Sequence, residues 1–245
     1  MLNKLFGTRE GADAAAPEGL RLYAVGDVHG RLDLLDRLLA LIAAETSAAA
    51  KRLIFLGDYV DRGPDSRGVI ERLVEIAARA PDSVFIRGNH EAILLSFLED
   101  PDRFADWFEW GGVETLESYG VPAEATAAPK EAAAALAASM PATHLAFLRG
   151  LPLSATFGDY FFVHAGVRPG VALDAQAERD LLWIRGEFHN APADKRPDKV
   201  IVHGHHPIRR PLDAGWRIAV DTGACFSDKL TAAVLEGSTR RFLST

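Results

Sequence analysis

The stretch RLIFLGDYVDRG, residues 52–63, decides the fold, because it joins a core strand directly to a polar turn. Residues 53–56 are a short apolar run of the kind that forms a buried strand. Asp58, Asp61 and Arg62 follow within the next six residues. Charged groups are costly to bury unless they have partners. The end of this strand is therefore where we expect a functional site.

Two other segments of the chain repeat this plan. Residues 20–45 and 82–100, like residues 51–80, contain an apolar run, a glycine with a polar residue after it, and then a helical pattern. The alternation predicts a βαβαβ unit with a parallel sheet buried on both faces. In open α/β sheets, ligands bind beyond the carboxyl ends of the strands. Six polar residues end these strands and should lie together: Asp27, His29, Asp58, Asp61, Asn89 and His90.

The rest of the chain divides into a helical part and a mostly β part. Residues 92–150 contain several short helical patterns without a core of their own, which predicts a small helical cap inserted into the fold. Two apolar runs flank Gly158 and Asp159, a hairpin signal, and four more strand-like segments follow. We expect an α/β fold of two sheets packed face to face with helices outside. It would be a single domain, residues 20–245, behind a flexible tail at residues 1–19.

The bulk composition excludes several classes of protein. With 48% hydrophobic and 25% charged residues among 245, the composition is that of an ordinary globular chain. The net charge of −7 argues against a broad nucleic-acid-binding face, and the single cysteine, Cys225, excludes an internal disulfide. The chain has no signal-peptide pattern and no apolar run of membrane-spanning length. We therefore expect a cytoplasmic protein with no nucleic acid, membrane or partner chain bound.

Strand ends in both halves of the chain supply a set of candidate metal ligands: Asp27, His29, Asp58, Asn89, His164 and His205. Two carboxylates, three imidazoles and an amide oxygen, without a thiolate, suit Mn²⁺, Fe or Zn²⁺ rather than a structural zinc site. Six ligands exceed the needs of one tetrahedral ion, so the set predicts two divalent metal ions. Asp58, from the middle strand, is the expected bridge between them.

Five short motifs occur in order along the chain: GDVHG at 26–30, GDYVDRG at 57–63, GNHE at 88–91, VHAG at 163–166 and GHHP at 204–207. In this order they resemble the calcineurin-like metallophosphoesterases, and most of all the phosphoprotein phosphatase branch with its bacterial and phage serine/threonine phosphatases. The resemblance runs from about Leu20 to Leu243 and is weak across the cap. It implies a four-layer αββα sandwich, in which two mixed β-sheets pack face to face between flanking helices.

The resemblance implies a role for each of the six candidate ligands. Asp27 and His29 would hold the first metal ion, and Asp58 would bridge the two ions. The second ion would be completed by Asn89, His164 and His205. We expect Mn²⁺ in both places, with Fe or Zn²⁺ as the alternatives.

The reaction implied by the resemblance is hydrolysis of a phosphoester by direct attack of a metal-bridging hydroxide on phosphorus. Metal lowers the pKa of bound water from 15.7 to about 7, so a hydroxide is available at neutral pH. Arg62, Asn89 and Arg185 would bind the phosphate oxygens. His90 would be the general acid that protonates the leaving group, and Asp61 would hold its imidazolium.

Three functions compete for this motif set. The one we expect is a serine/threonine protein phosphatase acting on a phosphoprotein or a small phosphoester. The second is a symmetrical dinucleoside tetraphosphate hydrolase; such enzymes share the first two motifs, the histidines and a similar DTGACF segment, but usually have GNHD and a longer cap. Glu91 and the short cap favour the phosphatase. The third, a catalytically silent scaffold, would be expected to lose ligands, and none of the expected ones is missing from the sequence.

Several conspicuous residues outside these roles are expected to serve the structure. Glu91 should support the turn of the GNHE motif. Trp107 and Trp110 should lie in the core of the cap rather than against a substrate. His203 should pack beside a ligand, and His206 should face solvent.

Overall fold

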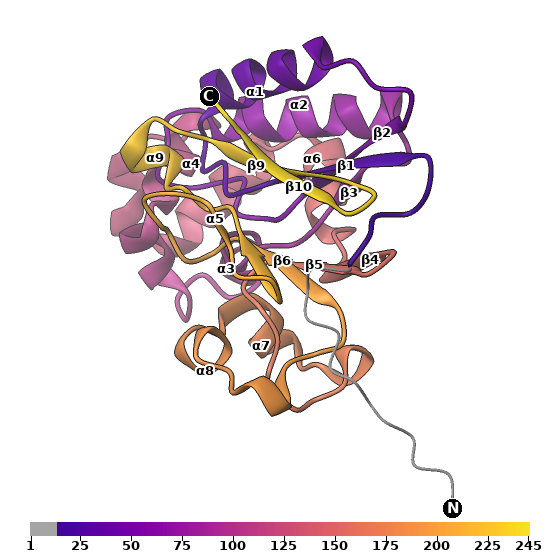
Figure 1. The fold of residues 1–245 in the computed structure, drawn as a ribbon. Helices are drawn as coiled ribbons and strands as arrows, with labels where there is room; N and C mark the ends of the chain where they lie inside the picture. Colours follow the sequence, from indigo (N-terminus) through magenta and orange to yellow (C-terminus); the bar gives the residue numbers. More distant parts are fainter. Residues whose placement is uncertain (1–13) are drawn as a thin grey trace, which may run out of the picture.

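The first of two sheets is built from strands at both ends of the chain. The computed structural model describes residues 14–245, and this sheet contains β1 (Leu20–Val25), β2 (Ala50–Phe55), β3 (Val84–Phe85), β9 (Thr231–Glu236) and β10 (Thr239–Ser244). The strand order is β10-β9-β1-β2-β3 (Figure 1). β1, β2 and β3 are parallel, whereas β9 and β10 are antiparallel to their neighbours. The predicted βαβαβ unit is confirmed.

The second sheet comes from the last third of the chain. Its strands are β4 (Ser154–Phe157), β5 (Tyr160–Val163), β6 (Val200–His203), β7 (Leu212–Asp213) and β8 (Arg217–Ala219). They lie in the order β4-β5-β6-β8-β7, with β5, β6 and β8 parallel and both edge strands antiparallel. Phe157 pairs with Tyr160 across the predicted hairpin turn, where Gly158 takes a φ of 57° that favours glycine.

The two sheets share a core because alternate residues of each strand point to opposite faces. Ala24 of β1 joins a buried cluster with Phe162 of β5 and Val202 of β6. Its neighbour Tyr23 belongs instead to the cluster formed with the helices that cover the first sheet. On the second sheet, Phe161 likewise turns away from the shared core. The sheets are therefore mixed and packed face to face, as predicted.

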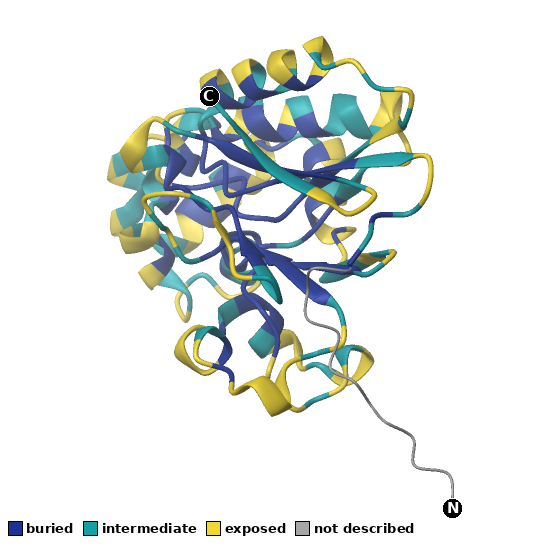
Figure 2. Cartoon of the chain, in the orientation of Figure 1, coloured by how far each residue is buried: buried dark blue, intermediate teal, exposed yellow. Residues whose placement is uncertain are grey.

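Helices cover the outer face of each sheet. α1 (Leu32–Ala44) and α2 (Ser66–Arg79) lie over the first sheet, and α7 (Glu178–Trp183) and α8 (Gly186–His189) lie against the second (Figure 1). Figure 2 shows the result, with buried strands inside and exposed helix turns outside. α7 and α8 are not among the predicted elements, because helices this short contain too few residues to show the hydrophobic periodicity of a helix.

The region between β3 and β4 is helical, as predicted. It contains α3 (Asn89–Glu99), a 3₁₀ helix (Ala105–Trp110), α4 (Gly112–Ser118), a 3₁₀ helix (Ala123–Ala127), α5 (Pro129–Ser139) and α6 (Ala142–Arg149). Trp107 and Leu136 from this region belong to the same buried cluster as Tyr23 of β1. The cap thus shares the core that lies beneath α1 and α2. Three further short helices follow: Leu173–Ala175, Ala193–Lys195 and α9 (Ala224–Ser227).

Part of the predicted N-terminal tail, residues 1–13, lies outside the described residues. Within residues 14–19, Ala14 and Ala16 are buried in the core between the sheets, and the N–H of Ala16 donates to the carbonyl oxygen of Gly237 at 2.8 Å. Among residues 14–245, no helix is both long enough and apolar enough to cross a bilayer.

Candidate metal centre and active site

Polar residues at the ends of strands from both sheets meet at one edge of the sandwich. Asp27 and His29 follow β1, Asp58 follows β2, and Asn89 and His90 begin α3 just after β3. The second sheet adds the residues that follow β5 and β6, His164 and His205. All seven side chains belong to residues that are at most 5% exposed, and hydrogen bonds or close ligand distances join them.

The backbone at this edge is strained. Among residues 14–245, six non-glycine residues have a positive φ, and five of them carry predicted site side chains: His29, Asp58, Asp61, Arg62 and His205. Such conformations cost about 1–3 kcal/mol each and persist only where surrounding contacts enforce them. The strain is therefore concentrated where the sequence places the chemistry.

Two motif glycines allow a close approach of backbone to carboxylate. A Cβ atom on Gly88 would collide with Oδ1 of Asp58, and one on Gly204 would collide with Oδ1 of Asp27. A larger residue at either position would push the carboxylate away from the site. This steric limit is the physical reason for glycine in the GNHE and GHHP motifs.

One group of donors that could hold a metal contains His29, Asp58 and His90, whose ligand atoms lie within 4.8 Å of one another. The Nδ1 atoms of both histidines are engaged: that of His29 donates to a backbone carbonyl oxygen at 2.9 Å, and that of His90 to Asp61 at 2.6 Å. Their Nε2 lone pairs therefore face the centre, where Arg62 donates to them at 3.0 and 2.9 Å. This tautomer is the one in which Nε2 can bind an ion or a proton.

A second group contains Asp58, His164 and His205, with ligand atoms within the same 4.8 Å. His164 donates from Nδ1 to a backbone carbonyl oxygen at 2.9 Å. Its Nε2 lone pair then faces Oδ1 of Asp58 at 3.3 Å and Oδ1 of Asn89 at 2.8 Å. Acceptor atoms at these separations repel one another unless a cation lies among them. Asn89 thus adjoins the second group, and Asp58 belongs to both.

The charges at this site fit the predicted pair of metal ions. Burial lowers the pKa of His29 to about 3 and that of His205 to about 2, which keeps both imidazoles in the neutral form that binds metals. Burial, with the nearby carboxylates of Asp221 and Asp58, raises the pKa of Asp27 well above its usual range. Buried carboxylates beside neutral imidazoles are stabilised by divalent cations.

Asp27 lies beside the two groups rather than within either. Its carboxylate accepts hydrogen bonds from the backbone N–H of His205 at 3.0 and 3.2 Å, and His90 stands in the first group where the sequence placed Asp27. Its role as a ligand stays a prediction. The motifs also missed Asp221, a buried carboxylate close enough to Asp27 to shift its pKa. The only sequence signal for Asp221 was the DTGACF segment that it begins.

Asp61 positions the ring of His90 and is itself held by the cap. The carboxylate that accepts from Nδ1 of His90 also accepts from Nε1 of Trp107 at 2.9 Å and from the hydroxyl of Thr115 at 2.7 Å. Burial would lower the pKa of His90, but the carboxylates of Asp58 and Asp61 raise it overall. Trp107 is buried, as predicted, yet neither its bond to Asp61 nor that of Thr115 had a sequence signal.

Glu91 supports the turns around the site, as predicted. Its carboxylate accepts from four backbone N–H groups at 2.7–3.2 Å, those of Asp58, Tyr59, Val60 and Gly88. Burial, together with the charge of Asp58, raises the pKa of Glu91 to about 7. This one side chain therefore ties the GDYVDRG turn to the GNHE turn.

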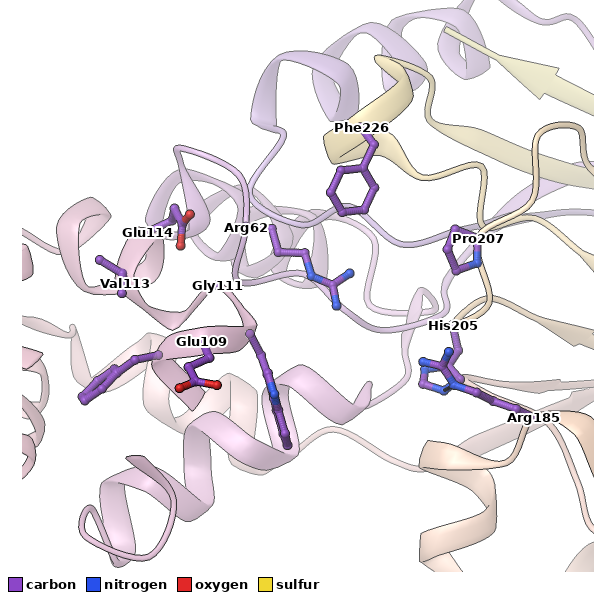
Figure 3. A pocket seen from close by; sticks show the side chains of 11 residues that line it. Arg62, Glu109, Gly111, Val113, Glu114, Arg185, His205, Pro207 and Phe226 are labelled. Carbon is purple, nitrogen blue, oxygen red and sulfur yellow. Dashed lines mark hydrogen bonds between the residues drawn. The ribbon is translucent and has the colours of Figure 1, made fainter. Parts of the chain in front are cut away.

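An open cleft of about 830 Å³ is lined by His205 and by cap residues 108–111, 113 and 114 (Figure 3). Arg62 and Arg185, two of the predicted phosphate ligands, both line it. Nε of Arg185 donates to Nε2 of His205 at 3.1 Å. On the cap side, the cleft is lined by Glu109 and Glu114.

Two expectations about residues near the cleft have different outcomes. The placement of Trp110 in the cap core is wrong: it lines the cleft and is 41% exposed, because its 3₁₀ helix ends there at Gly111, which has a φ of 102°. His203 is buried, as expected, and its Nδ1 donates to the carbonyl oxygen of Gly204 at 3.1 Å. His206, expected to face solvent, is half-buried.

A comparison with protein families identifies this arrangement. A family model described as calcineurin-like phosphoesterase matches residues 20–233, most of the chain. The chain belongs to this family. Two buried donor groups that share Asp58 agree with the match, and the protein is a metal-dependent phosphoesterase that hydrolyses phosphoesters.

Relatives with named activities resemble the phosphoesterase to different extents. It is 28% identical to the asymmetrical bis(5'-nucleosyl)-tetraphosphatase PrpE of Bacillus mycoides over 228 residues, which cover 84% of this chain and 87% of that one. It is 34% identical to the symmetrical bis(5'-nucleosyl)-tetraphosphatase of Methylococcus capsulatus over 156 residues, 61% of this chain and 44% of that one. The crystal structure of a candidate diadenosine tetraphosphatase matches with a TM-score of 0.65 at 23% identity, covering 91% and 93% of the two chains, and shows the shared fold.

Replacing Thr115 with valine should destabilise the phosphoesterase. Valine keeps the shape but removes the hydroxyl that donates to Asp61 and accepts from the Asp61 N–H at 2.9 Å. Because both partners are buried, we expect the free energy of unfolding to fall by about 1–3 kcal/mol in urea denaturation. Thr126→Val, which removes a partly buried cap hydroxyl bonded to one carbonyl oxygen, is the matched control. An unfolding curve for Thr115→Val like that of the control would contradict the role of this hydroxyl.

Replacing Glu91 with glutamine should loosen both turns of the phosphoesterase site. Glutamine offers one acceptor oxygen where the carboxylate offers two, and its amide group would face N–H donors. We expect a loss of about 3 kcal/mol in unfolding free energy and a metal affinity lower by about 10- to 100-fold. Glu75→Gln changes a partly exposed glutamate of α2 and serves as the control. Unchanged metal affinity in Glu91→Gln would show that the turns hold their shape without it.

Proposed function

We propose that this phosphoesterase hydrolyses dinucleoside tetraphosphates and cleaves them asymmetrically. The proposal is carried by two buried donor groups that share Asp58 beside a cleft lined by Arg62 and Arg185. The choice of substrate is supported by the relative PrpE, which aligns with most of both chains. The symmetrical relative aligns over only 44% of its own length, so the asymmetrical relative gives the stronger support.

This substrate replaces the serine/threonine protein phosphatase that the motifs favoured. One ground for the phosphatase was glutamate in place of aspartate in the third motif. The carboxylate of Glu91 binds four backbone N–H groups and Glu91 does not line the cleft. A residue that supports the turn does not by itself select between a phosphoprotein and a nucleotide. The other ground, the short cap, carries less weight because the match to PrpE covers 84% of this chain and 87% of that relative.

In this proposal two divalent ions, both Mn²⁺, would be held by the six predicted ligands: Asp27, His29, Asp58, Asn89, His164 and His205. Such a pair, when bound, supplies an acidified water as the nucleophile and polarises the phosphoryl group. The convergence of acceptor atoms around Asp58 supports this assignment.

The chain's own side chains would bind the substrate and move the proton. Guanidinium groups match phosphoryl oxygens as planar forks. Arg62 already donates to Nε2 of His29 and of His90, so a phosphoryl oxygen bound to Arg62 would lie beside both rings. Because Asp61 holds the Nδ1–H of His90, Nε2 is the atom that would deliver a proton to the leaving oxygen. Arg185 would bind the phosphate chain from the side of His205.

The test is a side-by-side assay of the purified protein with added Mn²⁺. The substrates are diadenosine tetraphosphate and a panel of phosphoserine and phosphothreonine peptides, and kcat/KM is compared because specificity is a ratio of these constants. Chromatography of the nucleotide products locates the cleavage: ATP with AMP means asymmetrical hydrolysis, whereas ADP alone means symmetrical hydrolysis. We expect the dinucleotide to be preferred, with ATP and AMP as products. A preference for the peptides would restore the protein phosphatase and overturn the proposal.

A further inference from the structure

The cleft has two exposed aromatic side chains at its rim. Among residues 14–245, four large apolar side chains are exposed, and two of them line this cleft: Phe226, which is 74% exposed, and Trp110, which is 41% exposed. Scattered apolar residues on a surface need no explanation, but those gathered at a site mark binding. The other two, Leu41 and Leu212, are not part of its lining.

Phe226 is held at the rim by the backbone of α9 rather than by packing of its ring. Arg31 donates to a carbonyl oxygen of α9 at 3.0 Å and to Asp228, directly after α9, at 2.5 Å. The ring itself lies beside Arg62, with its centroid 6.0 Å from the guanidinium carbon (Figure 3). The anchored helix thus leaves most of the ring accessible from the cleft.

Trp110 is connected to the metal centre through a second aromatic ring. Its centroid is 6.0 Å from that of Trp183, in an edge-to-face arrangement, and Trp183 is 6.2 Å from the ring of His205. Each rim aromatic is therefore one side chain away from the donor groups: Phe226 through Arg62, and Trp110 through Trp183. A phosphoryl group bound at the centre would bring an attached nucleoside to this rim.

We propose that Phe226 and Trp110 bind the nucleobases of the substrate by stacking. This inference rests on the proposed function and extends it by naming the part of the substrate that is recognised. Every base has a π face, so an aromatic side chain can stack on any of the nucleobases. Glu109 and Glu114 on the cap wall would accept hydrogen bonds from base amino groups or ribose hydroxyls. Their charges would repel phosphates, which keeps the phosphate chain on the side of the two arginines.

The kinetic test uses Phe226→Ala and Trp110→Ala with two substrates. Diadenosine tetraphosphate carries bases, and inorganic tetraphosphate has the same phosphate chain without them. We expect each variant to raise KM for the dinucleotide about 10-fold or more. The KM for inorganic tetraphosphate should change far less. Phe226→Tyr and Trp110→Phe keep the ring and should restore KM. Leu41→Ala removes an apolar side chain that is 40% exposed, like Trp110, and lies outside the cleft lining; it is the control.

An equilibrium measurement separates this inference from the proposed function. Titration calorimetry compares the binding of AMP with that of ribose 5-phosphate, which lacks the base. We expect AMP to bind more tightly to the wild type and to lose this advantage in both alanine variants. If the wild type leaves the dinucleotide intact but shows this pattern, the base site stands and the proposed function falls. Equal losses of affinity for AMP and for ribose 5-phosphate in the alanine variants, or no loss of affinity at all, would overturn the stacking role. The stacking role would also be overturned if a basic phosphopeptide bound tightly and this binding were lost in Glu109→Gln but not in Phe226→Ala.

Discussion

Replacing Asp58 with asparagine should lower kcat/KM by about 10³-fold or more and reduce the metal bound per chain. Asp58 is the residue that both donor groups share, and bound metal contributes several kcal/mol to the transition state, where each 1.36 kcal/mol is a factor of about ten in rate. Asparagine matches aspartate in shape and tolerates the left-handed backbone at this position, where φ is 51°. The variant should therefore fold. Elemental analysis and steady-state kinetics are the two measurements.

The matched control for this variant is Asp36→Asn. Asp36 is a partly exposed carboxylate of α1 that pairs with Arg72 and does not line the cleft, so its replacement changes the charge by the same amount outside the site. It should retain both metal and activity. Wild-type metal content in Asp58→Asn would contradict the proposed role of this carboxylate as the bridge between two ions.

Replacing His90 with asparagine should lower kcat/KM for an alkyl phosphate by about 10²–10⁴-fold. The leaving alkoxide of such a substrate needs a proton, and the proposed source is Nε2 of His90, whose Nδ1 is held by Asp61. Aryl phosphates and dinucleotides have better leaving groups and should lose much less. Parallel assays with an alkyl phosphate, an aryl phosphate and diadenosine tetraphosphate measure the difference.

Metal analysis of the same variant separates two roles for His90, because His90 also belongs to the first donor group. Retained metal with a selective loss on the alkyl substrate indicates a proton donor. Lost metal with equal losses on all substrates would make His90 a ligand and end its assignment as the acid. Asp61→Asn is the companion variant, since Asp61 contacts the ring of His90 through one hydrogen bond; it should show the selective pattern in a milder form.

The parts of the fold that could be predicted are those with local signals. The βαβαβ unit showed three apolar runs, each followed by a helical period, and the hairpin at Gly158 showed two apolar runs around a turn. α7 and α8 have no such signal, because a helix of six or four residues completes too few turns to display amphipathic periodicity. Their formation depends on packing against the second sheet, which is a property of the folded chain.

The candidate site was predictable to the extent that its residues lie in motifs. The motifs indicated which side chains would meet at the strand ends, but they could not show which residues would hold them. Trp107 and Thr115 bind Asp61 across 46 and 54 residues of sequence. They lie in a region whose composition is that of ordinary short helices, so nothing local indicated these contacts. Trp110 was misplaced for a related reason: an aromatic residue in an amphipathic helix looks the same whether its neighbour is a core or a cleft.

The donor atoms of the site come from two different sheets, so their separation depends on the thickness of the layer between those sheets. Ala24 and Ala233 pair across β1 and β9 and face that layer, where Phe162 comes from the opposite sheet. Interiors are close-packed, and an added methylene there must be accommodated by movement. A shift of the sheets by a fraction of an ångström would alter ligand distances that coordination holds within about 0.2 Å. Larger side chains at these alanines would thus leave a folded protein whose metal ligands are too far apart or too close together for coordination.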